Sequence, residues 1–187
     1  MKTTKWSLQE LNYVCDYHPF RVCGTPNPNK NQDTYRIMDM KDPTSHNFQR
    51  NLAYFQGVLL AFFRSFPEFI NFPVVNIAII PSSTAGNSSV ALTSIISHLN
   101  LNLGPRLIYN PDFLVRTKSI PSAHNGGARS AQIHLDSIEV KARINGDLPM
   151  ILLDDVYTTG SSMAACEQLL RNAGVKKLYK LVLGKTV

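Results

Sequence analysis

The chain has 187 residues, of which 44% are hydrophobic and 17% charged, and its 19 basic residues outnumber its 13 acidic ones. That length suits one globular domain with a single buried core, and the ordinary apolar content excludes wholesale disorder and collagen-like repeats. The longest apolar stretch, Gly57 to Phe63, is far shorter than the ~20 residues that a membrane helix needs. The first residues contain no apolar signal-peptide core, so we expect a cytoplasmic protein without a membrane partner.

The excess of positive charge, with an isoelectric point near 9.3, predicts an anionic partner. The basic residues form no long run, and their densest groups are Lys176-Lys177 and Arg116 to Lys118. A small phosphate-rich ligand needs only a few cations, whereas a nucleic-acid duplex usually meets a stripe of them. The pattern therefore favours a small anion over nucleic acid, and a merely solvated basic surface is the alternative.

Three cysteines are too few for a disulfide framework, which fits a reducing compartment. Cys15, His18 and Cys23 could supply three zinc ligands, but no second cysteine pair completes a typical site. Cys166 falls on the face of a predicted helix, where we expect it to pack.

Residues 1–40 are predicted to be irregular, because prolines, glycine and asparagines crowd positions 19–29, with one short strand at Tyr35 to Met40. A long helix follows, with Asp42 as its cap and Pro43 in its first turn. Apolar residues recur along it at helical spacing and are predicted to be core: Phe48, Leu52, Phe55, Leu59, Phe62, Phe63 and Phe66.

Strands then alternate with helices. The predicted strands are Val74 to Ile80, Arg106 to Tyr109, Met150 to Leu153 and Leu178 to Leu183; the predicted helices are Val90 to Leu99 and a second one ending near Asn172, before Gly174. Phe113 to Gly127 is predicted to be a mobile polar loop. This order predicts an α/β protein: an open, mostly parallel sheet with helices on both faces. We expect a single domain, with residues 41–187 as its core and residues 1–40 as a small irregular N-terminal hood.

One segment carries the clearest chemistry: Ile151-Leu152-Leu153-Asp154-Asp155-Val156-Tyr157-Thr158-Thr159-Gly160-Ser161-Ser162. It is an apolar strand ending in two acids, followed by a hydroxyl-rich turn that opens a helix. Amides at such a helix start form an anion cradle, and Gly160 permits close backbone approach. The adjacent carboxylates can accept hydrogen bonds from sugar hydroxyls or hold a hydrated Mg²⁺. The arrangement describes a ribose 5-phosphate site; the alternative is that the aspartates only cap the helix.

The letters LLDDVYTTGSS resemble the phosphoribosyl pyrophosphate (PRPP) binding motif of type I phosphoribosyltransferases, with Ser162 where the family often has threonine. The resemblance implies that Asp154 and Asp155 are catalytic, bind the ribose hydroxyls and hold Mg²⁺, in part through water. It implies that the 5-phosphate is bound by Thr158, Thr159, Gly160, Ser161 and Ser162.

Two further segments extend the resemblance. Pro81-Ser82-Ser83-Thr84-Ala85-Gly86 follows a predicted strand where the family has its pyrophosphate loop, so Ser82, Ser83, Thr84, Ala85 and Gly86 are implied to bind pyrophosphate. Phe113 to Arg129 resembles the family's mobile catalytic loop. Arg116, Lys118 and Arg129 are the implied catalytic cations and His124 a weaker candidate; each is alternatively a solvated loop charge.

Over residues 74–187 the pattern is most similar to the ComF-like branch of competence proteins. Two departures are visible. The cysteine-rich zinc module of that branch is reduced to Cys15, His18 and Cys23, and Asn87-Ser88-Ser89 replace its usual signature after the pyrophosphate loop. Met40-Lys41 echo an upstream element of the same branch.

The resemblance implies Mg²⁺-dependent transfer of a 5-phosphoribosyl group from PRPP to a nitrogenous, nucleobase-like acceptor, with release of pyrophosphate, and a homodimer. Mg²⁺ would clamp ribose and diphosphate oxygens, and a lid would exclude water. Tyr17, Phe20 and Tyr35 could stack the acceptor, and Tyr157 could lie near it. The rival hypothesis is a non-catalytic PRPP-binding regulator or a ComF-like DNA-associated protein, which the basic isoelectric point supports. A P-loop kinase is disfavoured because no GxxxxGK[ST] motif occurs.

Overall fold

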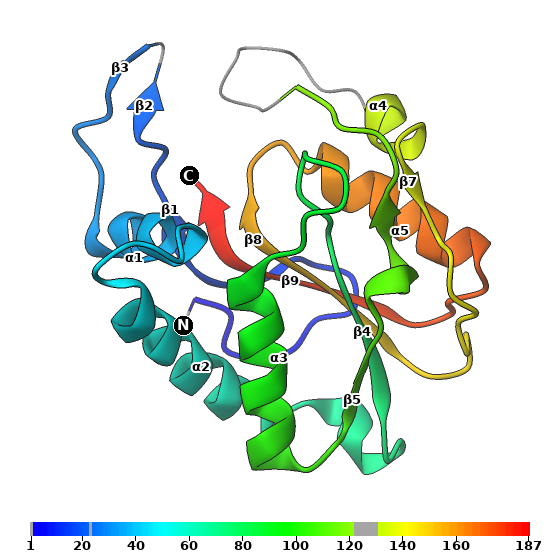
Figure 1. Cartoon of the computed structure of the whole chain (residues 1–187). Coiled ribbons are helices and arrows are strands. Elements are labelled where there is room, and N and C mark those ends of the chain that lie inside the picture. Colours follow the sequence, from blue (N-terminus) through cyan, green and yellow to red (C-terminus); the bar gives the residue numbers. More distant parts are fainter. Residues whose placement is uncertain (1, 23, 122–130) are drawn as a thin grey trace.

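The centre of the computed structural model, which describes residues 2–22, 24–121 and 131–187, is one β-sheet (Figure 1). Its strands run in the order β1-β9-β8-β4-β5, and every neighbouring pair is parallel. The strands are β1 (Asn12–Tyr17), β4 (Val75–Ile79), β5 (Leu107–Tyr109), β8 (Met150–Tyr157) and β9 (Leu178–Thr186). The predicted α/β class with a parallel sheet is confirmed.

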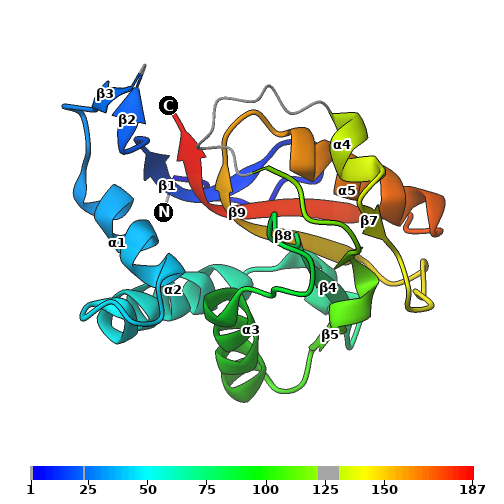
Figure 2. The same ribbon diagram turned by 45° about the horizontal axis from the view of Figure 1, so that its top comes forward.

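Helices cover both faces of the sheet, as Figure 2 shows. One face packs against α1 (Gln32–Lys41), α2 (Phe48–Phe63) and α3 (Val90–Leu103); the other packs against α5 (Ser161–Asn172), which α4 (Ala131–Leu135) contacts. Side chains alternate along β8, so Ile151 and Leu153 join the first core whereas Met150 and Leu152 join the second. Burial on both faces explains the unbroken apolar run of this strand. Within the described residues, no helix has the length and apolar character needed to cross a membrane.

The N-terminal segment, residues 1–40, contains more regular structure than the sequence predicted. β1 forms one edge of the main sheet, where it pairs with β9. The predicted strand at Tyr35 to Met40 is wrong, because these residues belong to α1. Asn31 caps that helix by accepting a hydrogen bond from the Thr34 amide, and Ile37 and Met40 are buried. Buried side chains three residues apart suit a helix. Packing of this segment against α2 and β9 decides between a helix and a strand.

The long aromatic helix, α2, begins later than predicted. Its first residue is Phe48, and Asp42 instead ends α1 and closes a turn by accepting hydrogen bonds from the amide and hydroxyl of Thr44. Its apolar stripe is buried as predicted, and Phe55, Leu59 and Phe63 are completely inaccessible. The core prediction is therefore confirmed. The predicted cap is wrong, because Asp42 ends α1 instead of starting α2.

Short elements complete the fold. They are β2 (Arg21–Val22), β3 (Thr25–Pro26), β6 (Val115–Arg116), β7 (Ile138–Glu139) and the 3₁₀ turns η1 (Pro67–Ile70) and η2 (Pro111–Phe113). The β2–β3 hairpin follows β1 directly and stands at the carboxyl edge of the main sheet (Figures 1 and 2). It is thus the part of the N-terminal segment that rises above this edge.

The predicted mobile loop is ordered over its first part. Phe113 and Leu114 are buried beside α5, and β6 pairs with β7 in an antiparallel arrangement. The two apolar side chains anchor the segment, which accounts for the difference from the prediction. Residues 122–130 lie outside the described residues.

The order of the strands identifies where this sheet has room for a ligand. After β4 the chain passes through α3 to β5 on one side, and it later returns to β8 on the other side of β4. Open α/β sheets bind ligands at such a reversal, outside the carboxyl ends of the strands. The carboxyl ends of β4 and β8 are therefore the place to look for a site.

Candidate functional site

Two loops leave the sheet side by side at this reversal. Ile79 of β4 is in register with Leu153 of β8, and the Ile80 amide donates to the Leu153 carbonyl at 2.9 Å. The segment Pro81 to Gly86, here called the first loop, starts directly after this contact. Thr158 to Met163, here called the second loop, follows β8 and its two aspartates. Two segments that are distant in the sequence thus share one edge of the sheet.

Asp154 and Asp155 stand at the carboxyl end of β8 and are both partly exposed. The Asp155 amide donates to Oδ1 of Asp154 at 2.8 Å. Lys41, the last residue of α1, places its Nζ 3.0 Å from Oδ2 of Asp155. The structure therefore adds a cation to the acidic pair that the motif alone did not contain.

The electrostatics of this pair follow from burial and proximity. Desolvation raises the pKa of Asp154 well above its usual range, and the neighbouring charge of Asp155 raises it further. Burial lowers the pKa of Lys41, but the charge and hydrogen bond of Asp155 outweigh it, so this pKa is raised. The site holds negative charge at a cost in free energy, which a bound cation or a hydroxyl donor would offset.

The second loop presents a row of free backbone donors. Gly160 precedes α5 with a φ of 81°, and no side chain caps this helix. The first amide to pair is that of Ala164, which donates to the Gly160 carbonyl at 2.8 Å. Among the residues that the structure describes, no acceptor pairs with the amides from Thr158 to Met163. Six amides beside the Thr159 and Ser161 hydroxyls, which lie 3.1 Å apart, form the kind of cradle that binds a phosphate group.

Gly160 is required in this loop for two independent reasons. Its φ lies in the left-handed region, which disfavours side chains. A Cβ at this position would also clash with the hydroxyl oxygen of Tyr157, whose ring packs over the loop. Tyr157 is thus a wall of the second loop, and a role toward the acceptor stays a prediction.

The first loop has the same character. Ser82 closes it on itself, with its hydroxyl donating to the carbonyls of Thr84 at 3.0 Å and Asn87 at 3.4 Å. In the described part of the chain, no acceptor pairs with the backbone amides of Ser82, Ser83 and Gly86. Free amides on two adjacent loops, with the acidic pair at the base of one, suit a ligand with two separate phosphate groups.

Of the three predicted catalytic cations, Arg116 lies in an unexpected place. It is 3% exposed in β6 rather than on a mobile loop, and its guanidinium contacts the carbonyls of Pro81 and Ser82 and the side chains of Ser137 and His134. Neither the mobile loop predicted for Arg116 nor the alternative of a solvated loop charge describes this position, and a catalytic role stays a prediction. Lys118 is exposed. Its segment is attached to the first loop by a hydrogen bond from the Ile120 amide to the Ser83 carbonyl at 2.9 Å. Arg129 and His124 lie outside the described residues.

The three aromatic candidates separate into two groups. Tyr17 is 7% exposed and directs its hydroxyl to the sulfur of Met38, so it is a core residue. Phe20 and Tyr35 are exposed and pack edge to face with ring centroids 5.7 Å apart, and Lys30 Nζ lies 4.1 Å from the Phe20 centroid. This exposed pair lies beside the β2–β3 hairpin.

The cysteines fit packing better than metal binding in the described residues. Cys15 is buried and donates to the Leu183 carbonyl, and burial raises the pKa of its thiol to about 12. Cys166 is completely buried, and its pKa is raised as well. Zinc binds thiolates, which both environments disfavour. Among the described residues no group of three metal-ligating side chains is found; Cys23 lies outside them.

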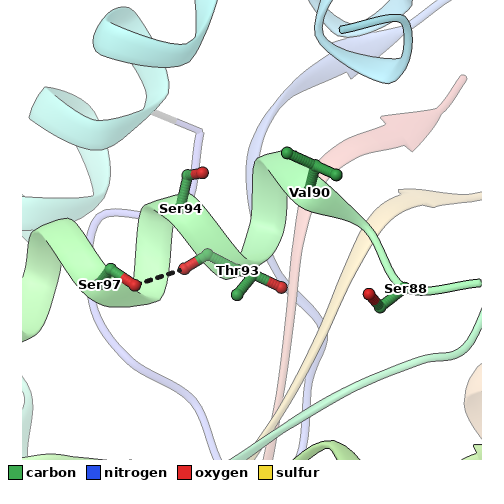
Figure 3. Close-up of a pocket in the computed structure, with 5 residues that line it drawn as sticks. All are labelled: Ser88, Val90, Thr93, Ser94 and Ser97. Atoms are coloured by element: carbon green, nitrogen blue, oxygen red, sulfur yellow. Dashed lines mark hydrogen bonds between the residues drawn. The ribbon is translucent and has the colours of Figure 1, made fainter.

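Two hollows lie near the first loop, and neither is lined by Asp154 or Asp155. The larger, about 360 Å³, runs along α3 and is lined by Ser88, Val90, Thr93, Ser94 and Ser97 (Figure 3). Its hydroxyls are partly used within the helix, since Ser97 donates to the Thr93 carbonyl. The smaller, about 200 Å³, lies between the first loop and the segment after β5, with Arg116 in its lining. The lining of the α3 hollow contains no charged side chain, so we do not assign the site to this hollow.

Two contributions to the site were missed by the sequence reasoning. The sequence points to Lys41 only through the Met40-Lys41 pattern, and no local signal connects it with Asp155, 114 positions away. Ser137 and His134, which hold Arg116, lie in a stretch without a motif.

No protein-family model matches the chain, and no curated protein matches it. Its function is therefore inferred from the residues and their geometry.

Proposed function

We propose that this protein transfers a 5-phosphoribosyl group from PRPP to a nitrogenous, nucleobase-like acceptor and releases pyrophosphate. One observation carries the proposal: two adjacent loops with free amides flank an acidic pair at the topological reversal of a parallel sheet. PRPP has a 5-phosphate at one end, a diphosphate at the other and a diol between them. The second loop, the first loop and the aspartates match these three groups in turn.

In the proposed reaction, the bond between the ribose C1 and the diphosphate oxygen breaks, and pyrophosphate leaves with the electron pair. A nitrogen of the acceptor forms the new bond to C1 and then loses its proton to solvent. Negative charge grows on the leaving group, so the free amides of the first loop stabilise it as preorganised donors. Asp154 and Asp155 accept hydrogen bonds from the ribose hydroxyls. Their negative charge stabilises the positive charge that develops on the ribosyl centre.

A divalent cation fits the same donor set. Mg²⁺ prefers hard oxygen ligands and keeps several of its waters, and two partly exposed carboxylates supply such ligands. When bound, it would neutralise diphosphate charge. Lys41 already compensates Asp155, so the acidic pair is held in place before a cation arrives. Both aspartates are the residues that would hold it.

A second candidate function is binding without turnover, as in a PRPP-responsive regulator or a ComF-like DNA-associated protein. The net positive charge, from 19 basic against 13 acidic residues, is compatible with this alternative. It predicts PRPP binding without pyrophosphate release, together with DNA binding that weakens as salt rises. A cytoplasmic location stays a prediction from the sequence, and a homodimer stays a prediction of the resemblance.

Calorimetric titration of the full chain with PRPP, with and without Mg²⁺, is the first test. We expect Mg²⁺-sensitive binding, followed by pyrophosphate release when a panel of nucleobases is added. Binding without release for any base would favour the regulator, and DNA titrations at two salt concentrations would then follow. Failure of the wild-type protein to bind PRPP in either condition would refute both PRPP-dependent functions.

A further inference from the structure

Arg116 is a buried charge directed at the backbone of the first loop. Its Nε donates to the Ser82 carbonyl, and its Nη2 lies 3.5 Å from the Pro81 carbonyl. Two side chains from the α4–β7 segment hold the guanidinium from the other side: the Ser137 hydroxyl at 2.6 Å and the His134 Nδ1 at 3.2 Å. An arginine that is 3% exposed and bonded on both sides is fixed in orientation.

Fixing these two carbonyls also fixes the direction of the amides that follow them. The chain has no cis peptide bond among its described residues. In a trans peptide the C=O of one residue and the N–H of the next point in opposite directions. The Ser82 and Ser83 amides therefore point away from Arg116, and they are two of the three loop amides that have no acceptor in the described chain.

We propose that Arg116 is a positioning residue, which orients the Pro81–Ser82 and Ser82–Ser83 peptides so that the first loop becomes a receptor for the diphosphate group. The proposal rests on the proposed function for the identity of the ligand. It assigns the arginine a role that differs from direct contact with substrate. The guanidinium acts from behind the loop, and the two amides make the contact.

The hydroxyl of Ser137 shows how the arrangement is kept rigid. This hydroxyl accepts from Arg116 and donates to the Ile133 carbonyl at 2.7 Å, so it joins the guanidinium to the backbone of α4. On the outer side of the loop, the Ala85 amide donates to the Ser119 hydroxyl at 2.9 Å. The loop is thus held from both ends while its central amides stay available.

The test is titration of ¹⁵N-labelled full-length protein with inorganic pyrophosphate and, separately, with ribose 5-phosphate, each with Mg²⁺ present. In the wild-type protein we expect pyrophosphate to shift the Ser82 and Ser83 amide resonances. Arg116→Gln should weaken pyrophosphate binding by about 10-fold or more, since hydrogen bonds to charged groups are among the stronger ones. Affinity for ribose 5-phosphate, read at the second loop, should change by less than about 2-fold because that loop does not contact Arg116.

Two variants keep the test informative. Arg116→Lys retains the charge but loses the planar fork, so we expect an intermediate affinity and a preserved fold. Arg106→Gln is the matched control, because Arg106 also donates to two backbone carbonyls, those of Phe69 and Pro73, near the other end of β4. We expect it to leave pyrophosphate binding unchanged.

The inference is overturned if folded Arg116→Gln and Arg116→Lys bind pyrophosphate as the wild type does, or if Arg106→Gln weakens it equally. It is also overturned if pyrophosphate leaves the wild-type Ser82 and Ser83 resonances unshifted. Failure of the proposed function looks different: PRPP would yield no pyrophosphate with any base. In that case the pyrophosphate titration still decides the role of Arg116.

Discussion

The two ends of the sheet each hold a lysine–carboxylate pair, but in different surroundings. At the amino end Glu68 is buried and fully used: it accepts from the Tyr179 hydroxyl at 2.7 Å and from Lys177 at 3.1 Å. Around it Trp6, Phe66 and Tyr179 pack ring against ring. At the carboxyl end Asp155 pairs with Lys41 and Asp154 has a raised pKa. Within the described part of the chain, the nearby amides from Thr158 to Met163 have no acceptor.

The difference separates the groups that stabilise the fold from the groups that remain available to bind a ligand. Satisfied polar groups inside an aromatic cluster stabilise the fold, whereas unsatisfied donors and crowded carboxylates reduce stability until a ligand arrives. Substitutions at the amino end should therefore alter the free energy of unfolding alone. Substitutions at the carboxyl end should alter ligand binding.

The largest expected effect is at the amino end. Phe63→Ala removes a completely buried ring that packs edge to face against Trp6, and should lower the free energy of unfolding by about 3–5 kcal/mol. Urea unfolding followed by circular dichroism measures this loss. Ile70→Ala, on the same end but 86% exposed, is the control and should change stability by less than about 0.5 kcal/mol. Equal losses in the two variants would contradict the assignment of the aromatic cluster.

The next effect is on binding. The double variant Asp154→Asn/Asp155→Asn should lower PRPP affinity by about 100-fold or more in the presence of Mg²⁺, because it removes both carboxylates while keeping their shape. Calorimetry with and without Mg²⁺ measures the change. Glu167→Gln serves as an acidic control outside the site, because this α5 carboxylate pairs with Arg171 of the same helix and with Lys180 of β9. Undiminished PRPP binding by the double variant would remove the aspartates from the proposed site.

A pair of glycine variants separates the effect of backbone strain on stability from the effect on ligand binding. Gly160→Ala and Gly174→Ala both place a side chain at positive φ, so each should cost about 1–2 kcal/mol of stability. Only Gly160 also lies against Tyr157 and opens the amide cradle, so only its variant should weaken ribose 5-phosphate binding, by about 10-fold. Thermal unfolding and calorimetry supply the two readouts. The comparison fails if both variants bind ribose 5-phosphate alike.

The smallest effect concerns Asp154 alone. Its folded-state pKa is raised, so the folded protein binds this proton more tightly than the unfolded chain does. Stability therefore falls as pH rises from about 3.9 through the raised pKa. Asp154→Asn removes the penalty, so its free energy of unfolding at pH 7 should be higher than that of the wild type. The gain should disappear near pH 4.

Urea unfolding at both pH values tests this sign. Asp155→Asn is the contrasting variant, because it loses the ion pair with Lys41 and should gain nothing. A stability loss for Asp154→Asn at pH 7 would show that this carboxylate stabilises the fold instead of straining it.

The sequence by itself determined the alternation of strands and helices, the buried stripe of α2 and the loop that opens α5, because these depend on local periodicity and on residue types with strong backbone preferences. It failed within the N-terminal segment 1–40, where short patterns suit a strand or a helix equally well and packing against α2 and β9 decides. It also predicted a mobile polar loop around Arg116. Burial of Phe113 and Leu114 draws that segment onto the second core, which no local pattern reveals.

Only the tertiary structure decided which distant groups meet at the carboxyl edge. Parallel pairing of β4 with β8 brings the first loop beside the aspartates, and the end of α1 brings Lys41 to Asp155. The direction of the Ser82 and Ser83 amides depends on a guanidinium more than 30 positions away. Local sequence fixes which atoms can donate or accept, whereas long-range packing fixes where they point, because the free energy that orients them comes from contacts between remote segments.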